Sequence, residues 1–225
     1  MSKIYTSQTT VKQNTEEAIS QASTKIVAQI LKNEHLVQND LVSIVFQASK
    51  ELTTVSPAKG PRTQLGLSET CFFAQYLPFK SGHKLSVDIT VNTQNTPALH
   101  AVRAATNIEI NNLQLIQKNL ISLLLNLTQL NNIRKKNLHK IYISVSTDID
   151  KEKINISKIL QKADLENVNY EFTYDTPISP DHPMYLARAI RILLHYYPKD
   201  PSSTPIPLYL NKTAKKLRPD LIQPS

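Results

Sequence analysis

Residues 14–30, Asn-Thr-Glu-Glu-Ala-Ile-Ser-Gln-Ala-Ser-Thr-Lys-Ile-Val-Ala-Gln-Ile, have the pattern of a long helix that begins with its own cap. The opening Asn14-Thr15-Glu16-Glu17 supplies an N-cap residue followed by Glu, as is typical of a helix start. The apolar residues that follow recur at helical spacing: Ile19, Ala22, Ile26 and Ile30. A stripe of this kind must be buried, and we expect it to face a sheet.

Short β-branched and apolar segments surround this helix. Their composition and alternation predict strands at residues 3–11, 40–48, 70–77 and 85–92. A loop that contains Pro, Gly and Lys, from Ser56 to Gly66, separates the second strand from the third. The predicted order is therefore strand, long helix, strand, loop, strand, strand.

The same order returns later in the chain. Residues 99–106 read as a strand, and Asn111-Asn112 can cap a second helix. Its apolar face is formed by Leu113, Ile116, Leu120, Leu124 and Leu127. Further strands are predicted at residues 140–145, 168–174, 186–196 and 207–210, with a short helix over residues 152–162. Residues 93–106 can serve as the end of the first copy, the start of the second, or both.

This repetition, with a period of about 100 residues, indicates a tandem duplication. We assign residues 1–97 to the first copy and residues 98–225 to the second. Each copy is predicted to be an α+β unit, a mixed β-sheet covered by one long helix. Because the open face of such a sheet needs a neighbour, we expect the two units to pack as a pseudo-oligomer.

Composition narrows the function. The chain has 225 residues, a formal charge of +8, three glycines and a single cysteine, Cys71. Glycine-rich phosphate loops, internal disulfides and multi-cysteine zinc sites are therefore not expected. The six histidines show no ligand spacing, and we expect them at the surface or in turns. No apolar run approaches the roughly 20 residues of a membrane span, and the first residues lack a signal sequence, so we expect a cytoplasmic protein.

The positive charge predicts an anionic partner. The basic clusters are short, at Arg134-Lys135-Lys136 and between Lys212 and Arg218, and cations at helix ends complement the helix dipole. A nucleic-acid binder would spread basic and aromatic residues over one surface. A small anionic metabolite is therefore favoured over nucleic acid.

Three stretches carry a resemblance to a known family. They are Thr9-Thr10-Val11 with the helix start that follows it, Ser56-Pro57-Ala58-Lys59-Gly60-Pro61-Arg62, and Tyr209-Leu210 with Leu217-Arg218-Pro219-Asp220-Leu221. They resemble the trimeric, monofunctional, non-helical chorismate mutases, whose members are about half as long and whose active sites lie between subunits. The second stretch is similar to the family loop Phe-Pro-Ala-Lys-x-x-Arg, with Ser56 in place of the aromatic residue.

The second copy holds two further matches. Val102-Arg103-Ala104-Ala105-Thr106 resembles the family's opening Ile-Arg-Gly-Ala-Thr, and Arg188-Ala189-Ile190-Arg191-Ile192 resembles the strand with its essential Arg. In the first copy these Arg positions hold Thr6 and Ser86. The second copy in turn lacks the Pro-Ala-Lys-x-x-Arg loop and has residues 150–162 there. Because the losses are complementary, we expect one composite site between the copies.

The resemblance implies a chorismate-binding enzyme that rearranges chorismate to prephenate without a metal or other cofactor. It assigns Arg191 to the ether oxygen, Arg103 to a carboxylate and Tyr209 to a hydrogen bond. Lys59 and Arg62 would lie at the entrance of the site and attract the substrate. Further substrate-binding positions are Ala58, Thr176 and Leu217. The family's assembly implies a homo-oligomer.

One family feature is missing. The position of the catalytic Glu holds Ser179 in the second copy and falls near Ala74 or Tyr76 in the first. Asp181, Asp175 or Glu171 could substitute for it, depending on the path of the Pro-rich segment between them. Two alternatives to the mutase therefore stay open. One is another chorismate-consuming enzyme, a lyase or hydrolase with a hydroxybenzoate-type product, and the other is a protein that binds a chorismate-like metabolite without converting it.

Overall fold

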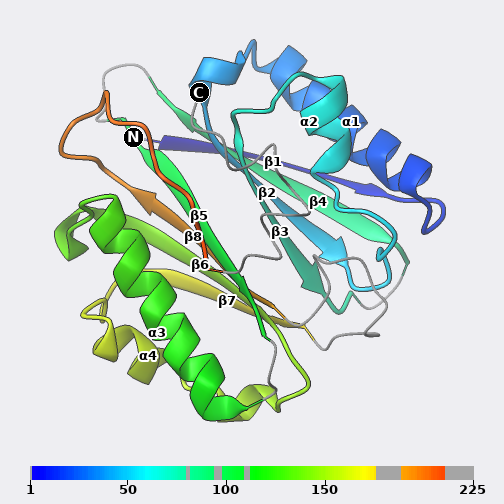
Figure 1. Ribbon diagram of the computed structural model, residues 1–225. Coiled ribbons are helices and arrows are strands. Elements are labelled where there is room, and N and C mark those ends of the chain that lie inside the picture. Colours follow the sequence, from blue (N-terminus) through cyan, green and yellow to red (C-terminus); the bar gives the residue numbers. More distant parts are fainter. Residues whose placement is uncertain (1, 80–81, 94–97, 109–111, 176–188, 211–225) are drawn as a thin grey trace. The chain divides into compact units, whose positions relative to one another are not determined.

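A computed structural model describes residues 2–79, 82–93, 98–108, 112–175 and 189–210 of the chain (Figure 1). Contacts between backbone positions divide these residues into two compact units, one that extends to Ala101 and one that begins at Val102. Each unit is a mixed sheet with helices, so the structure is α+β, as the sequence predicts.

The first unit contains a four-stranded sheet. Its elements are β1 (Ser2–Thr10), α1 (Glu16–Asn33), β2 (Leu41–Ser49), α2 (Lys59–Gln64), β3 (Cys71–Leu77) and β4 (Lys84–Asn92). The strand order is β1-β4-β2-β3, with β2 and β3 parallel and the other neighbours antiparallel. The four strands predicted in this half are confirmed to within a few residues.

The second unit repeats this plan with one extra strand. Its elements are β5 (His100–Asn107), α3 (Leu113–Leu130), β6 (Leu138–Ser146), α4 (Ile156–Lys162), β7 (Tyr170–Asp175), β8 (Ala189–Tyr196) and β9 (Leu208–Tyr209). The strand order is β7-β6-β8-β5-β9, with β6 parallel to β7 and antiparallel to β8. Residues 100–107 thus belong to the second sheet, where β5 pairs with β9.

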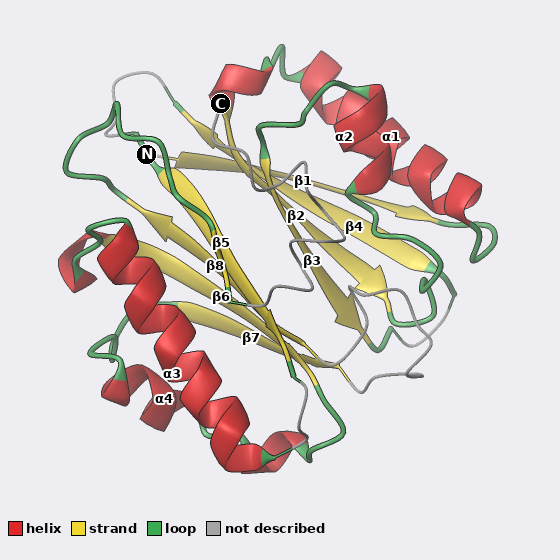
Figure 2. Cartoon of the chain, in the orientation of Figure 1, coloured by secondary structure: helices red, strands yellow, loops and turns green. Residues whose placement is uncertain are grey.

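Each sheet is covered by helices on one face (Figure 2). In the first unit, Ile19, Ile26 and Ile30 of α1 are buried, as their spacing predicts. They belong to one cluster with Ile44 of β2 and Val87 of β4. The apolar side of α3 is buried in the same way against alternate residues of β6 and β8. Alternation along each strand therefore fixes which residues face the helices and which face the opposite side.

Two local predictions differ from the structure, the first in kind and the second in its bounds. The expected loop from Ser56 to Gly66 contains the helix α2, which begins at Lys59 and accepts Pro61 within its first turn, where the missing N–H costs nothing. The expected helix over residues 152–162 is interrupted. Its first part is a 3-10 turn, Lys151–Lys153, and α4 begins only after Asn155, whose side chain caps it by accepting a 2.9 Å hydrogen bond from Lys158 N.

The cap of α1 also differs in detail from the expectation. Thr15, rather than Asn14, is the N-cap residue, and its hydroxyl accepts from the N–H of Ala18. Asn14 instead binds the segment that follows β2. Its side-chain oxygen accepts from the N–H of Thr53 at 2.9 Å and of Thr54 at 3.2 Å. This contact ties the start of α1 to the segment that leads into α2.

Candidate functional site

The three residues predicted to be catalytic lie on one face of the second sheet. On β8, Ile190 and Ile192 belong to the core under α3, so Arg191 between them faces the opposite side. On β5, Arg103 lies between the core residues Val102 and Ala104 and takes the same side. The strand order β8-β5-β9 makes these strands neighbours.

Tyr209 completes this group from β9. It pairs in register with Ala105, which is two residues beyond Arg103 on the same face of β5. Its neighbour Leu208 packs against the core beneath the helices, which places the Tyr209 side chain on the opposite face. Arg103, Arg191 and Tyr209 are all half-buried. Two fixed guanidinium groups and a phenol on one sheet face suit a ligand with carboxylates, because Arg binds carboxylates in a bidentate manner.

Arg191 lies in a row of polar residues across the sheet. The register pairs it with Ser144 on β6, and Ser144 with Thr173 on β7. Ser144 is fully buried, and its hydroxyl has no hydrogen-bond partner in the described part of the chain. We refer to Arg191, Ser144 and Thr173 as the arginine row. No local sequence pattern selects Ser144, because only the strand register places it opposite Arg191.

Three acidic residues are candidates to replace the missing Glu: Glu171, Asp175 and Asp181. Asp175 is the last residue of β7, and its side chain lies outside the described part of the chain. Glu171 lies on β7, two residues before Thr173, and binds Lys140 at 3.0 Å. Burial lowers the pKa of Lys140, but its hydrogen bond with Glu171 and contact with Tyr142 outweigh this effect and leave the pKa raised. Glu171 is thus engaged in an ion pair. Ser179 and Asp181 lie outside the described residues, as do the predicted ligand contacts Thr176 and Leu217.

His195 corrects the expectation that all histidines lie at the surface or in turns. It is on the same face of β8 as Arg191 and is only 2% exposed. Its ring meets that of Tyr142 edge to face at 5.3 Å. Burial, together with His139 and Lys140 nearby, lowers the pKa of His195 to about 3, so the imidazole is neutral at physiological pH.

The corresponding face of the first sheet has no arginine. Ser86 of β4 pairs in register with Gln47 of β2, as Arg191 pairs with Ser144 in the second sheet. The Ser86 hydroxyl donates to the Gln47 carbonyl at 3.3 Å. Nearby, Thr6 of β1 donates to Asp88 at 2.8 Å. Thr6 and Ser86, the positions where the first copy lacks the family's arginines, therefore make neutral or internally satisfied pairs.

The predicted cations of the first copy are on α2. Lys59 forms an ion pair of 2.5 Å with Glu16 at the start of α1, and both side chains are about half exposed. The guanidinium carbon of Arg62 lies 4.9 Å from the ring centre of Phe72, a cation–π contact. Ala58, just before α2, is buried in the first core. The ion pair of Lys59 with Glu16 is weak because both side chains are half exposed to solvent. Arg62 instead packs against the apolar ring of Phe72.

The described residues contain neither a metal-binding cluster nor a helix that could span a membrane. No cluster of His, Cys, Asp and Glu with the arrangement of a metal site occurs among them. No helix in the described part of the chain is long and apolar enough to span a membrane.

Comparison with known proteins identifies one family. The sequence profile of chorismate mutase type I matches the chain twice, over residues 7–96 and 99–221. The structure of chorismate mutase from Clostridium thermocellum is similar over 49% of this chain and 94% of its own, with 20% identity and a TM-score of 0.41. Cyanuric acid hydrolase from A. caulinodans is similar over 87% of this chain and 67% of its own, with 7% identity and a TM-score of 0.48. No curated protein matches the chain.

Proposed function

The chain belongs to the chorismate mutase type I family, whose sequence it carries twice, and on this premise we propose that it binds chorismate and rearranges it to prephenate. The observation that carries the proposal is the shared face of Arg103, Arg191 and Tyr209 on neighbouring strands of the second sheet. Each of the three matches a residue that the family uses, and each comes from a different strand.

The reaction defines what these residues must do. It is a pericyclic rearrangement, so the protein must hold a flexible dianion in its reactive shape and stabilise the charge that grows on the ether oxygen. Arg191 is assigned to that oxygen and Arg103 to a carboxylate, with Tyr209 as a hydrogen-bond donor. Removing one such fixed donor typically costs about 10²–10³ in rate. The buried Ser144 hydroxyl supports this assignment, because it offers a further donor beside Arg191.

Lys59 and Arg62 of α2 are proposed to act on the same substrate. Lys59 can leave its exposed ion pair with Glu16 at little cost, which suits a residue that attracts an anion. Arg62 is supported by Phe72 and would hold a fixed position. The involvement of Ala58, Thr176 and Leu217 also stays a prediction, tested by the same ligand measurements.

A second candidate function is binding of a chorismate-like metabolite without turnover. It is favoured by the chemistry around the arginine row, where Ser144 and Thr173 are neutral and Glu171 is paired with Lys140. Among the described side chains of this row none is a free carboxylate, so one catalytic contact of the family has no counterpart among them. The cationic residues would still bind the dianion.

Incubation of the purified protein with chorismate, followed by NMR identification of the product, tests the proposal. We expect prephenate from the natural protein, none from Arg191→Ala, and unchanged formation from Ser86→Ala, the equivalent position in the first sheet. A hydroxybenzoate-type product would instead show a lyase or hydrolase. Chorismate binding in calorimetry without any product would support the second candidate.

A further pair of variants tests the role of the first copy. Arg62→Gln removes the guanidinium group that lies over Phe72 and keeps a shorter, neutral polar side chain. Under the proposal, Arg62→Gln and Lys59→Ala raise the KM for chorismate, while the exposed Gln64→Ala on the same helix does not. An unchanged KM in both variants would contradict the contribution of α2.

The proposed partner, location and assembly of the protein follow from the same proposed substrate and family. A small anionic metabolite, rather than nucleic acid or a membrane, would be the partner, and the protein would act in the cytoplasm as an assembly of several copies. Light scattering of the purified protein measures the last of these, and a monomer would contradict it.

A further inference from the structure

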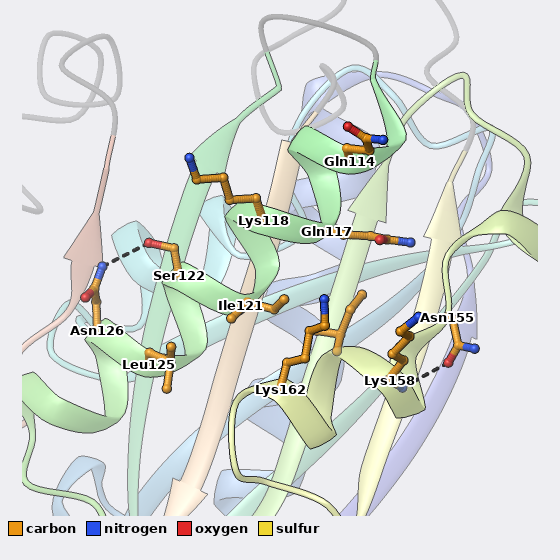
Figure 3. Close-up of a pocket in the computed structure, with 11 residues that line it drawn as sticks. Gln114, Gln117, Lys118, Ile121, Ser122, Leu125, Asn126, Asn155, Lys158 and Lys162 are labelled. Carbon is orange, nitrogen blue, oxygen red and sulfur yellow. Dashed lines mark hydrogen bonds between the residues drawn. The ribbon is translucent and has the colours of Figure 1, made fainter.

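A groove runs between α3 and α4, on the helix-covered side of the second sheet (Figure 3). It has a volume of about 480 Å³. The floor and walls include the apolar side chains of Ile121, Leu125 and Ile159. Figure 3 shows Gln117 and Ile121 extending from α3 toward α4. The groove is therefore a separate feature from the face that carries Arg103 and Arg191.

All charged residues that line the groove are positive. Lys118 of α3 and Lys158 and Lys162 of α4 line it, all three are exposed, and no lining residue is acidic. Helices α3 and α4 contain no Asp or Glu at all. Just beyond α4, Asp164 and Glu166 both bind Lys135, so these nearby carboxylates are already engaged. The cations of the groove suit an acidic occupant.

The shape of the groove suits an elongated occupant. The lining residues of α3 recur at helical spacing from Gln114 to Asn126, and those of α4 from Asn155 to Lys162. At 1.5 Å per residue, the α3 wall is about 18 Å long, or three helical turns. Leu125, which is 43% exposed, lies near one end of it. A groove with apolar contacts along a helix and cations on its rim matches the mode in which an amphipathic helix binds.

The first unit explains how the groove arises. There, α2 lies directly on α1, because Gly60 has no side chain. A Cβ at Gly60 would come within 2.4 Å of the Ser20 carbonyl oxygen. The short helix of the second unit has no glycine, and space remains beside α3. One contact closes the region near its edge, where Gln117 donates to the Lys153 carbonyl at 3.4 Å.

We infer that this groove binds an acidic amphipathic helix of a partner protein. Its apolar side would contact Ile121 and Leu125, and its Glu or Asp side chains would pair with Lys118, Lys158 and Lys162. The chain's own residues 211–225 are a poor occupant, because they carry four basic residues and one acidic residue. A second copy of the same surface would be repelled for the same reason.

A designed peptide tests the inference. It is a fluorescein-labelled helix of about 18 residues, long enough to be helical, with Leu on one side and Glu on the flanks. Fluorescence anisotropy against the full chain should show saturable binding that weakens with added salt. The variant Lys158→Glu/Lys162→Glu should weaken it by about 10-fold or more, as should Leu125→Asp. The matched control Lys25→Glu, at an exposed position on α1, should leave it unchanged.

Three outcomes would overturn the inference. One is equal binding of a peptide with Lys in place of Glu, which would remove the role of charge. Another is displacement of the labelled peptide by poly-glutamate as effectively as by the unlabelled peptide at the same concentration of charge. That result would show a general attraction of polyanions. The third is full binding to the double variant. Circular dichroism checks that each variant is folded, and chorismate handling, which uses the other face, should stay unchanged in all of them.

Discussion

The two sheets share a backbone plan but differ in the face that points away from their helices. In the second sheet this face carries Arg103, Arg191 and Tyr209, and the buried hydroxyl of Ser144 lies beside Arg191. In the first sheet the row that contains Ser86 is neutral, and Ser86 binds Gln47. The comparison shows that two sheets of one plan and register can carry arginines at these positions in one copy and internally hydrogen-bonded polar residues in the other.

The short helices of the two units, α2 and α4, also differ. The short helix of the first unit carries Lys59 and Arg62 and lies closely on α1. The short helix of the second unit stands beside a groove lined by lysines. Both short helices thus carry cations, but only the second sheet carries arginines on the face away from its helices, and four experiments test this comparison.

The largest effect is expected when the second face is made like the first. Arg191→Ser copies the residue at the equivalent position of the first sheet and removes the side chain that we propose as the donor at the developing charge. Chorismate conversion should fall by about 10³-fold, whereas Arg191→Lys, which keeps the charge and loses the fork, should fall less. Initial rates measured by NMR check both, with Ser86→Ala as control. A rate within a few-fold of the natural protein in Arg191→Ser would show that the two faces are equivalent.

The next effect concerns the packing of α2. Gly60→Ala places a Cβ within 2.4 Å of the Ser20 oxygen and 2.5 Å of the Thr24 hydroxyl, so α2 must move from α1. The free energy of unfolding should fall by about 1–3 kcal/mol, measured with urea. Gln64→Ala, exposed on the same helix, should change it by less than about 0.5 kcal/mol. Equal stability of the two variants would mean that the helices are not in close contact.

A pH effect of similar size should be confined to the second sheet. The pKa of His195 is lowered to about 3 in the folded state, against its usual 6.5. The unfolded chain therefore binds a proton as the pH falls below about 6.5 while the folded state does not, and stability is lost until the folded group also titrates. The loss should reach about 3 kcal/mol near pH 4, at 1.36 kcal/mol for each pH unit.

The control for this experiment copies the first sheet. Thr90 stands where His195 stands in the second sheet, as the pairing with Ser43 and with Lys140 shows. His195→Thr should lower the free energy of unfolding at neutral pH, because the smaller side chain leaves a cavity. It should also remove the part of the acid-induced loss of stability that His195 causes. An unchanged pH dependence in His195→Thr would assign the loss to other groups.

The smallest effect compares the caps of the two long helices. Thr15 caps α1 and Asn112 caps α3, each through one hydrogen bond from the N–H three residues on. Replacement of either by Ala should cost about 1 kcal/mol of unfolding free energy. Because α1 also has Glu16 and Glu17 in its first turn and α3 has no acidic residue there, α3 should be the more sensitive helix. A larger loss for Thr15→Ala would contradict this order.

The sequence predicted the long helices and most strands because periodic burial leaves a direct signal. Ile19 and Ile26, or Leu120 and Leu124, are spaced for one helix face and are buried there. The same alternation places Arg103 and Arg191 on one sheet face. Helix α2 was missed, since Pro and Gly in residues 56–66 indicate a loop unless the close contact with α1 is known.

The features that the sequence could not predict depend on strand register and on contacts between residues far apart in the chain. Ser144 is selected only by its pairing with Arg191, and the burial of His195 depends on residues on β6 such as Tyr142. Neither leaves a local pattern in sequence. The family resemblance supplied the predicted roles of Tyr209, Lys59 and Arg62, which composition and spacing could not provide.

The parallel pairs β2–β3 and β6–β7 have a consequence for how such a duplicated chain can change. Strands that run side by side in the same direction cannot be joined by a hairpin, so a crossover segment must pass over the sheet. In this chain those two segments hold α2 and α4. Every copy is thus obliged to keep a surface connection whose length and side chains are free to vary. Repeated copies of this plan can therefore acquire new surfaces there while their sheets stay intact.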